Sequence, residues 1–180
     1  MNNKLAYKIA LGGVISALCL MFMFCSGLFP MFDYAIPTFA GFLMVIMIVE
    51  TSPAWAFTTY VSVSFLAVLI TPNLQCSLLF VIFMGYYPIL KYFLDRLPMR
   101  ILATVIKFAV FNGAVLAFYY LFQFVFMTED MFEGMEKFGK YAGIILLAGA
   151  NFFFIIYDWL VGQLTVLYVT WFRKKILRRK

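Results

Sequence analysis

Two charged side chains lie inside long apolar segments, where they could carry a proton or contact a substrate. Asp158 precedes Arg173 by 15 residues, which is about 22 Å along an ideal helix. Lys107 follows Arg100 by seven residues, or about 10 Å. A charge in hydrocarbon is costly and usually faces the interior of a helix bundle, so both residues are candidates for function.

These two residues have a structural and a functional interpretation. The structural one is an ion pair or hydrogen-bonded packing between two helices, and the functional one is a proton or substrate relay. In upright helices the depths of Lys107 and Asp158 differ by roughly 10 Å, which argues against a tight pair, although helix tilt and the long lysine stem could close some of that gap. We therefore expect Asp158 to be protonated or hydrogen-bonded to amides of the neighbouring helix, in a mainly architectural role. We expect Lys107 to extend toward the headgroups.

The same two segments carry four side-chain amides, Asn112, Gln123, Asn151 and Gln163. Hydrogen bonds between helices are the default role of such amides. Gln123 and Asn151 lie toward the outer halves of their segments, so they could line a cavity open to the outside. Polar side chains of the outer turns would converge with them in a compact bundle. The resulting substrate-binding candidates are Asp33, Tyr34, Asn73, Gln75, Gln123 and Asn151.

Signatures of enzymes are missing from the sequence. The chain contains no histidine, which excludes histidine bases and histidine metal ligands. It has no Walker-type phosphate loop and no paired carboxylates on one helix. Three dispersed cysteines, Cys19, Cys25 and Cys76, lack metal-ligand spacing; a Cys25–Cys76 disulfide and plain packing are both open. We expect no enzymatic activity, no cofactor and no bound metal.

Small residues recur in the first apolar segment at Ala6, Ala10, Gly13 and Ala17, spaced four, three and four apart. This spacing places them on one helix face. A face of small side chains allows another helix to approach closely. That helix could belong to the same bundle or to a partner protein, since the face lies in the cytoplasmic half.

The segments that position these residues are those of a membrane protein. Of the 180 residues, 66% are hydrophobic and 12% are charged, an apolar excess that a soluble domain of this size could not bury. The sequence predicts one all-α domain, residues 1–180, with six transmembrane helices. The expected spans are 9–29, 35–49, 54–71, 76–94, 101–127 and 142–171. The second is short and the third borderline, so a re-entrant hairpin is the alternative.

Basic residues set the expected orientation. Lys and Arg concentrate near both chain ends and in the 95–100 loop, whereas the outer loops contain only Lys137 and Lys140. The positive-inside rule then places both termini in the cytoplasm. Six of the last eight residues are basic, and we expect this cluster to bind anionic lipid headgroups rather than nucleic acid.

The chain resembles the substrate-binding S component of an energy-coupling factor (ECF) vitamin transporter. The shared features are its length, six spans joined by short loops, cytoplasmic termini and the small-residue face of the first helix. The Ala6–Ala10 and Gly13–Ala17 pairs resemble that family's Ala-x-x-x-Ala docking motif, although glycine replaces alanine at position 13. The Gly85–Lys91 stretch is also similar to the family, without an assigned role. No sub-family motif names a vitamin.

The resemblance implies a plasma-membrane subunit that binds a small-molecule nutrient from outside. It would dock through its first helix onto a membrane coupling subunit that is driven by two ATPases. Two other functions stay open. One is a small polytopic scaffold of membrane or cell-envelope machinery, which the lack of a sharp ligand motif favours. The other is an ion-coupled transporter that relies on Asp158 and Lys107.

Overall fold

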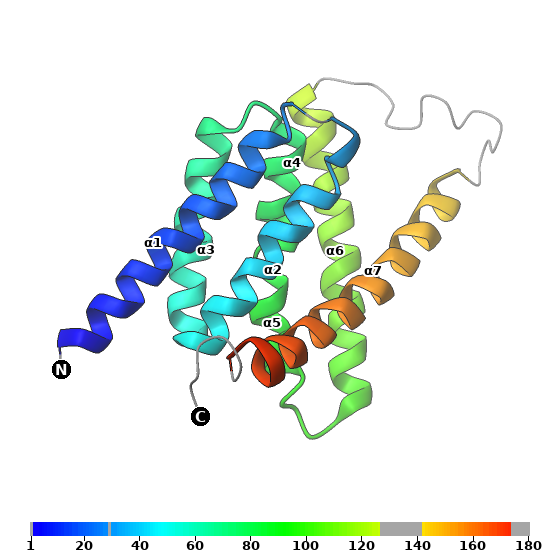
Figure 1. Cartoon of the computed structure of the whole chain (residues 1–180). Helices are drawn as coiled ribbons and strands as arrows, with labels where there is room; N and C mark the ends of the chain where they lie inside the picture. The colour runs from blue at the N-terminus through cyan, green and yellow to red at the C-terminus, as the bar shows by residue number, and fades with distance from the viewer. Residues whose placement is uncertain (1, 29, 127–141, 174–180) are drawn as a thin grey trace. The chain divides into compact units, whose positions relative to one another are not determined.

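A computed structural model describes residues 2–28, 30–126 and 142–173 of the chain (Figure 1). The described residues form helices and connecting turns, with no strand. The elements are α1 (Asn2–Cys25), η1 (Pro30–Phe32), α2 (Ala35–Glu50), α3 (Pro53–Ile70), α4 (Leu74–Leu79), η2 (Phe80–Met84), α5 (Tyr87–Leu94), α6 (Arg100–Phe126), α7 (Ala142–Leu167) and η4 (Tyr168–Phe172). The basic cluster from Lys174 onward lies outside the described residues, and so do Lys137 and Lys140.

Five segments of the described chain are long and apolar enough to cross a bilayer. They are Lys4–Cys25, Pro53–Ile70, Leu74–Leu94, Arg100–Phe124 and Gly143–Phe172. Large apolar side chains point outward from them, including Phe65 at 67% exposure and Ile101 at 82%. Outward-facing apolar side chains suit lipid as the solvent, so these are the helices of a membrane protein. At 16 residues α2 is shorter, and six spans therefore remain a prediction.

The chain divides into two compact units, residues 1–96 with 161–180 and residues 97–160, which are described separately. In the first unit α1, α2 and α3 pack on one another (Figure 1). Their contact is built from fully buried Cys19, Met44, Met47, Ala56 and Val63. The small side chains among them, Cys19 and Ala56, let these helices approach, because the backbones come closer when few side-chain atoms intervene.

Although α2 has only 16 residues, it reaches both ends of the first unit. Tyr34, just before α2, contacts Gln75 near the start of α4, and Glu50 at its last turn contacts Tyr7 of α1. We call the end with Tyr34 and Gln75 the turn end, and the other the Glu50 end. The helix α2 thus extends from one end of the first unit to the other, and the choice between a full span and a re-entrant hairpin stays a prediction.

The predicted run 76–94 of the first unit is interrupted in its middle. Its helix passes from α4 through the π-helical η2 to a turn at Gly85 before α5 begins. A Cβ at Gly85 would lie 2.7 Å from the Tyr60 ring and 2.8 Å from the Phe80 ring, so only glycine fits without a shift of these rings. The Tyr60 hydroxyl donates a 2.6 Å hydrogen bond to the Val81 carbonyl. This bond satisfies a backbone group at the break, as an apolar environment requires. Gly85, the first residue of the Gly85–Lys91 stretch, thus has a structural role.

The second unit contains α6 and the part of α7 up to residue 160. Phe111 and Phe154 stack between them with ring centroids 4.5 Å apart, and Phe108 meets Phe154 edge-on at 5.1 Å. Phe154 is 1% exposed. These rings accompany the polar contacts between the two helices.

Candidate functional site

The turn end of the first unit collects four of the predicted substrate-binding residues. Gln75 Nε2 donates to the Tyr34 hydroxyl at 3.2 Å, so the structure brings these two together. The Asn73 side chain accepts from the Cys76 backbone N–H at 3.3 Å and caps α4. This contact gives Asn73 a structural role, because an Asn at an N-cap satisfies an otherwise unpaired N–H.

Asp33 completes this group and differs from it in one respect. Its Oδ1 is buried and has no hydrogen-bond partner, although the residue as a whole is half-buried. Cys76 is fully buried and lies within electrostatic range of the carboxylate. The thiols of Cys19, Cys25 and Cys76 are free, and Cys19 and Cys76 serve as packing.

At the opposite end of the first unit a carboxylate that sequence reasoning missed is almost fully enclosed. The Glu50 side chain is 1% exposed and lies 3.4 Å from Arg173 Nε. The hydroxyls of Tyr7 and Tyr168 donate to its two oxygens at 3.4 and 3.3 Å. One acid thereby connects α1, α2 and the end of the α7 segment. One feature of the sequence could have indicated Glu50: it is an acidic residue at the end of an apolar helix, and no basic residue lies near it in sequence.

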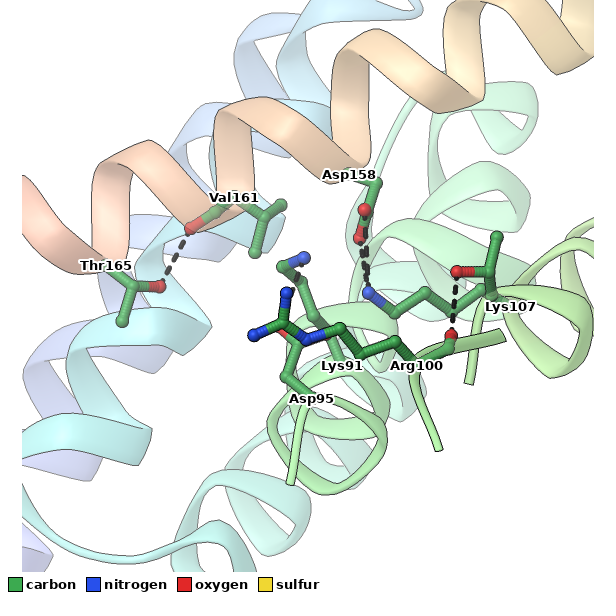
Figure 2. Close-up of polar contacts among 8 residues, drawn as sticks. Lys91, Asp95, Arg100, Lys107, Asp158, Val161 and Thr165 are labelled. Atoms are coloured by element: carbon green, nitrogen blue, oxygen red, sulfur yellow. Dashed lines mark hydrogen bonds and ion pairs between the residues drawn. The ribbon is translucent and has the colours of Figure 1, made fainter. Parts of the chain in front are cut away.

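Lys91 of α5 is a second residue that the sequence did not single out. It is 9% exposed, and its Nζ lies 3.2 Å from Asp95 Oδ2, one turn later (Figure 2). A Cβ on Gly162 would be 3.7 Å from Lys91 Cε, so the lysine stem packs against this glycine. Its apolar stem is thus buried while its ammonium group is paired.

In the second unit Lys107 and Asp158 form an ion pair (Figure 2). Lys107 Nζ donates to the two carboxylate oxygens at 3.2 and 3.5 Å. The expectation that depth prevents a tight pair was wrong, and Lys107 is the partner of Asp158 in place of the expected amides. The apolar stretch Gly143–Phe172 has 30 residues and spans about 45 Å, against about 30 Å of hydrocarbon. Such a helix must tilt or protrude, so its residues lie less deep than an upright helix implies.

The side-chain amides of the second unit do not pair as predicted, because Gln123 and Asn151 have different partners. Asn112 and Asn151 exchange two hydrogen bonds of 3.0 Å, and each also donates to a carbonyl of its own helix at 2.8 Å. Gln123 donates instead to Tyr119 OH at 2.9 Å, 11 residues or about 16 Å beyond Asn112 on α6. Asn151 and Gln123 are therefore not brought together. Gln163 is exposed on the part of α7 in the first unit.

The small residues of α1 face outward. Ala6, Ala10, Gly13 and Ala17 are all exposed, and a Cβ on Gly13 would meet nothing within 4 Å. Gly12 on the other side faces Thr59 and Met47 instead. The packing of α1 inside the first unit thus uses a different face from the small-residue face.

The chemistry available to these groups is binding and pairing. Among the described residues no group of three His, Cys, Asp or Glu side chains could hold a metal ion. The ion pair and the amide pair are self-satisfied, whereas Asp33 retains an unused acceptor. No protein-family model, curated protein or solved structure matches the chain.

Proposed function

We propose that the chain is the substrate-binding membrane subunit of an ECF-type nutrient transporter in the plasma membrane. In this proposal it docks onto a coupling subunit that two ATPases drive. The observation that carries the proposal is the exposed small-residue face of α1, with open space around the Cβ position of Gly13. Such a face suits close packing by a partner helix, and no described residue covers it.

The arrangement of charge in the first unit supports the orientation that this function needs. Its described basic residues are Lys4, Lys8, Lys91, Arg96 and Arg173. Tyr7 and Arg173 both contact Glu50, so the start of α1 and the end of the α7 segment share one end. With that end in the cytoplasm, the turn end with Asp33, Tyr34 and Gln75 faces the outside, where a nutrient would enter.

Docking is tested by Gly13→Trp against Gly113→Trp as the matched control. Both glycines lie in long helices, and a Cβ added at either position would meet no atom within 4 Å. The tagged full-length protein is purified from its native membrane and the associated chains are identified. Gly13→Trp should lose a membrane partner and two ATPase chains that Gly113→Trp retains. Retention of all three by Gly13→Trp would contradict docking through this face.

The same experiment separates the transporter subunit from a scaffold. A scaffold could also use the face of α1, but its partner would arrive without an ATPase pair. Orientation has its own test by labelling of introduced cysteines in intact cells. Met31→Cys, at a position that is 94% exposed, should react with an impermeant reagent, and Arg96→Cys should not. The reverse pattern would place the turn end inside and exclude uptake through it.

A further inference from the structure

Asp33 carries an acceptor that the described protein does not use. Its Oδ1 is buried and receives no hydrogen bond. A buried carboxylate oxygen without a donor is strongly disfavoured, because it has lost water and gained nothing in exchange. Buried polar atoms are nearly always paired, so an unpaired one indicates a missing partner.

The helix that follows does not supply this partner. Asp33 lies two residues before α2, where the helix dipole favours a negative charge. However, the start of α2 has no side-chain cap, with Tyr34 at the N-cap position. Asp33 thus makes no capping bond there, and the dipole offers only a partial charge of about half a unit.

No described basic side chain of the first unit can reach Asp33 either. Residues 9–90 contain no Lys or Arg. Lys8 lies 17 residues before Cys25, about 25 Å from the turn end, and Lys91 lies 17 residues after Leu74, a similar distance. Arg173 pairs with Glu50, 15 residues or about 22 Å along α2 from Ala35. The carboxylate is therefore uncompensated by the described residues of its own unit.

The groups around Asp33 suit an organic cation better than a metal ion. Phe32 and Tyr34 are aromatic and exposed at 54% and 57%, and aromatic faces attract ammonium and amidinium groups. Gln75 donates to Tyr34 and keeps its own carbonyl as an acceptor for a further N–H. A metal ion would need more oxygen or sulfur ligands, and no such cluster occurs among the described residues.

We infer that Asp33 binds the protonated amine or amidinium group of a small molecule at the turn end, with Tyr34 and Gln75 beside it. The inference rests on the proposed role of this chain as a substrate-binding subunit, and it names the substrate class as cationic and nitrogen-containing. The ligand would supply both the missing donor and the missing positive charge. A neutral nutrient would supply at most the donor and not the charge, and an anionic one would be repelled by the carboxylate.

The test is thermal unfolding of the purified full-length protein with solutes that are matched in shape and differ in charge. The pairs are benzamidine and benzamide, tyramine and tyrosol, and tryptamine and tryptophol. At least one cationic member should raise the melting temperature of the wild type clearly more than its neutral counterpart does. Asp33→Asn should weaken that binding about 10- to 100-fold, the loss expected for a charged hydrogen bond. Asp95→Asn is the control, since it removes a carboxylate that is 48% exposed at the Glu50 end.

Each outcome of these melting-temperature measurements either supports or contradicts the inference. If Asp33→Asn is not monodisperse, Tyr34→Leu replaces it, because this exposed ring can be removed without opening the core, and it should weaken cation binding too. Cation binding that survives the variant, equal stabilisation by neutral partners, or no stabilisation by any cation would overturn the inference. A neutral nutrient that binds at the turn end would overturn it alone and leave the proposed function intact. The Gly13→Trp experiment is the one that would reject the transporter hypothesis itself.

Discussion

Breaking the Lys107–Asp158 ion pair should reveal whether it stabilises the second unit. Lys107 has a side chain that is 10% exposed and Asp158 one that is 29% exposed. Removing one partner of a buried pair costs about 3–5 kcal/mol, since the other charge is left without compensation. We expect Asp158→Leu to lower the free energy of unfolding by about 3 kcal/mol, the lower end of this range, because the long lysine stem can carry its unpaired ammonium group toward the headgroups. Asp158→Asn should cost less, because its carbonyl can still accept from Lys107.

The decisive variant replaces both residues. Lys107→Leu with Asp158→Leu removes both charges, and such replacements of buried pairs are often neutral or stabilising. The double variant should therefore recover most of the stability that either single variant loses. Unfolding in mixed micelles, titrated with a denaturing detergent and followed by fluorescence of the neighbouring Trp159, measures all four proteins. If the double variant is as unstable as the sum of the single ones, the two residues are not coupled and the ion pair is not what stabilises these helices.

Three further changes test the other polar and steric contacts by the same unfolding assay. Asn151→Leu should cost about 1–3 kcal/mol, because Asn112 loses both reciprocal hydrogen bonds; no change would mean that the amide pair is dispensable. Gly85→Ala should cost about 1–3 kcal/mol, because the new methyl group would press on the Tyr60 ring at 2.7 Å; a stabilised protein would contradict this packing. Glu50→Leu should cost about 1–3 kcal/mol by leaving its two tyrosine donors and the Arg173 charge unpaired, and Glu50→Gln should cost less; equal losses for the two variants would rule out hydrogen bonding as the cause.

The positions of the helices could be predicted well because lipid imposes one simple rule. Apolar runs of about 20 residues must be helical, since no other local structure satisfies the backbone in hydrocarbon. The expected runs 35–49, 54–71 and 101–127 correspond to Ala35–Glu50, Pro53–Ile70 and Arg100–Phe126. The break at Gly85 was not predictable, because the segment is apolar on both sides of it. It depends on Tyr60, 25 residues earlier, reaching the Val81 carbonyl.

The polar contacts were only partly predictable, because they depend on tilt and register that spacing does not encode. The residue types were sufficient to single out Lys107 and Asp158, but upright-helix depths wrongly separated them. Gln123 and Asn151 were grouped because both lie in outer halves, whereas the amide that faces Asn151 is Asn112. Glu50 escaped notice because its partners are as far away in sequence as Arg173.

The two units use their polar groups in different ways, which bears on where a ligand can bind. In the second unit a positive charge meets a negative one and one amide meets another, so a ligand would first have to break an existing pair. In the first unit Glu50 is enclosed by donors at one end, while Asp33 at the other keeps a buried oxygen without any. A ligand that supplies a donor there replaces nothing and completes an unmet hydrogen bond. A ligand at the turn end thus gains a hydrogen bond without breaking an existing pair, once the side chains that cover the Asp33 oxygen move aside, and Asn151 is the weaker candidate of the two.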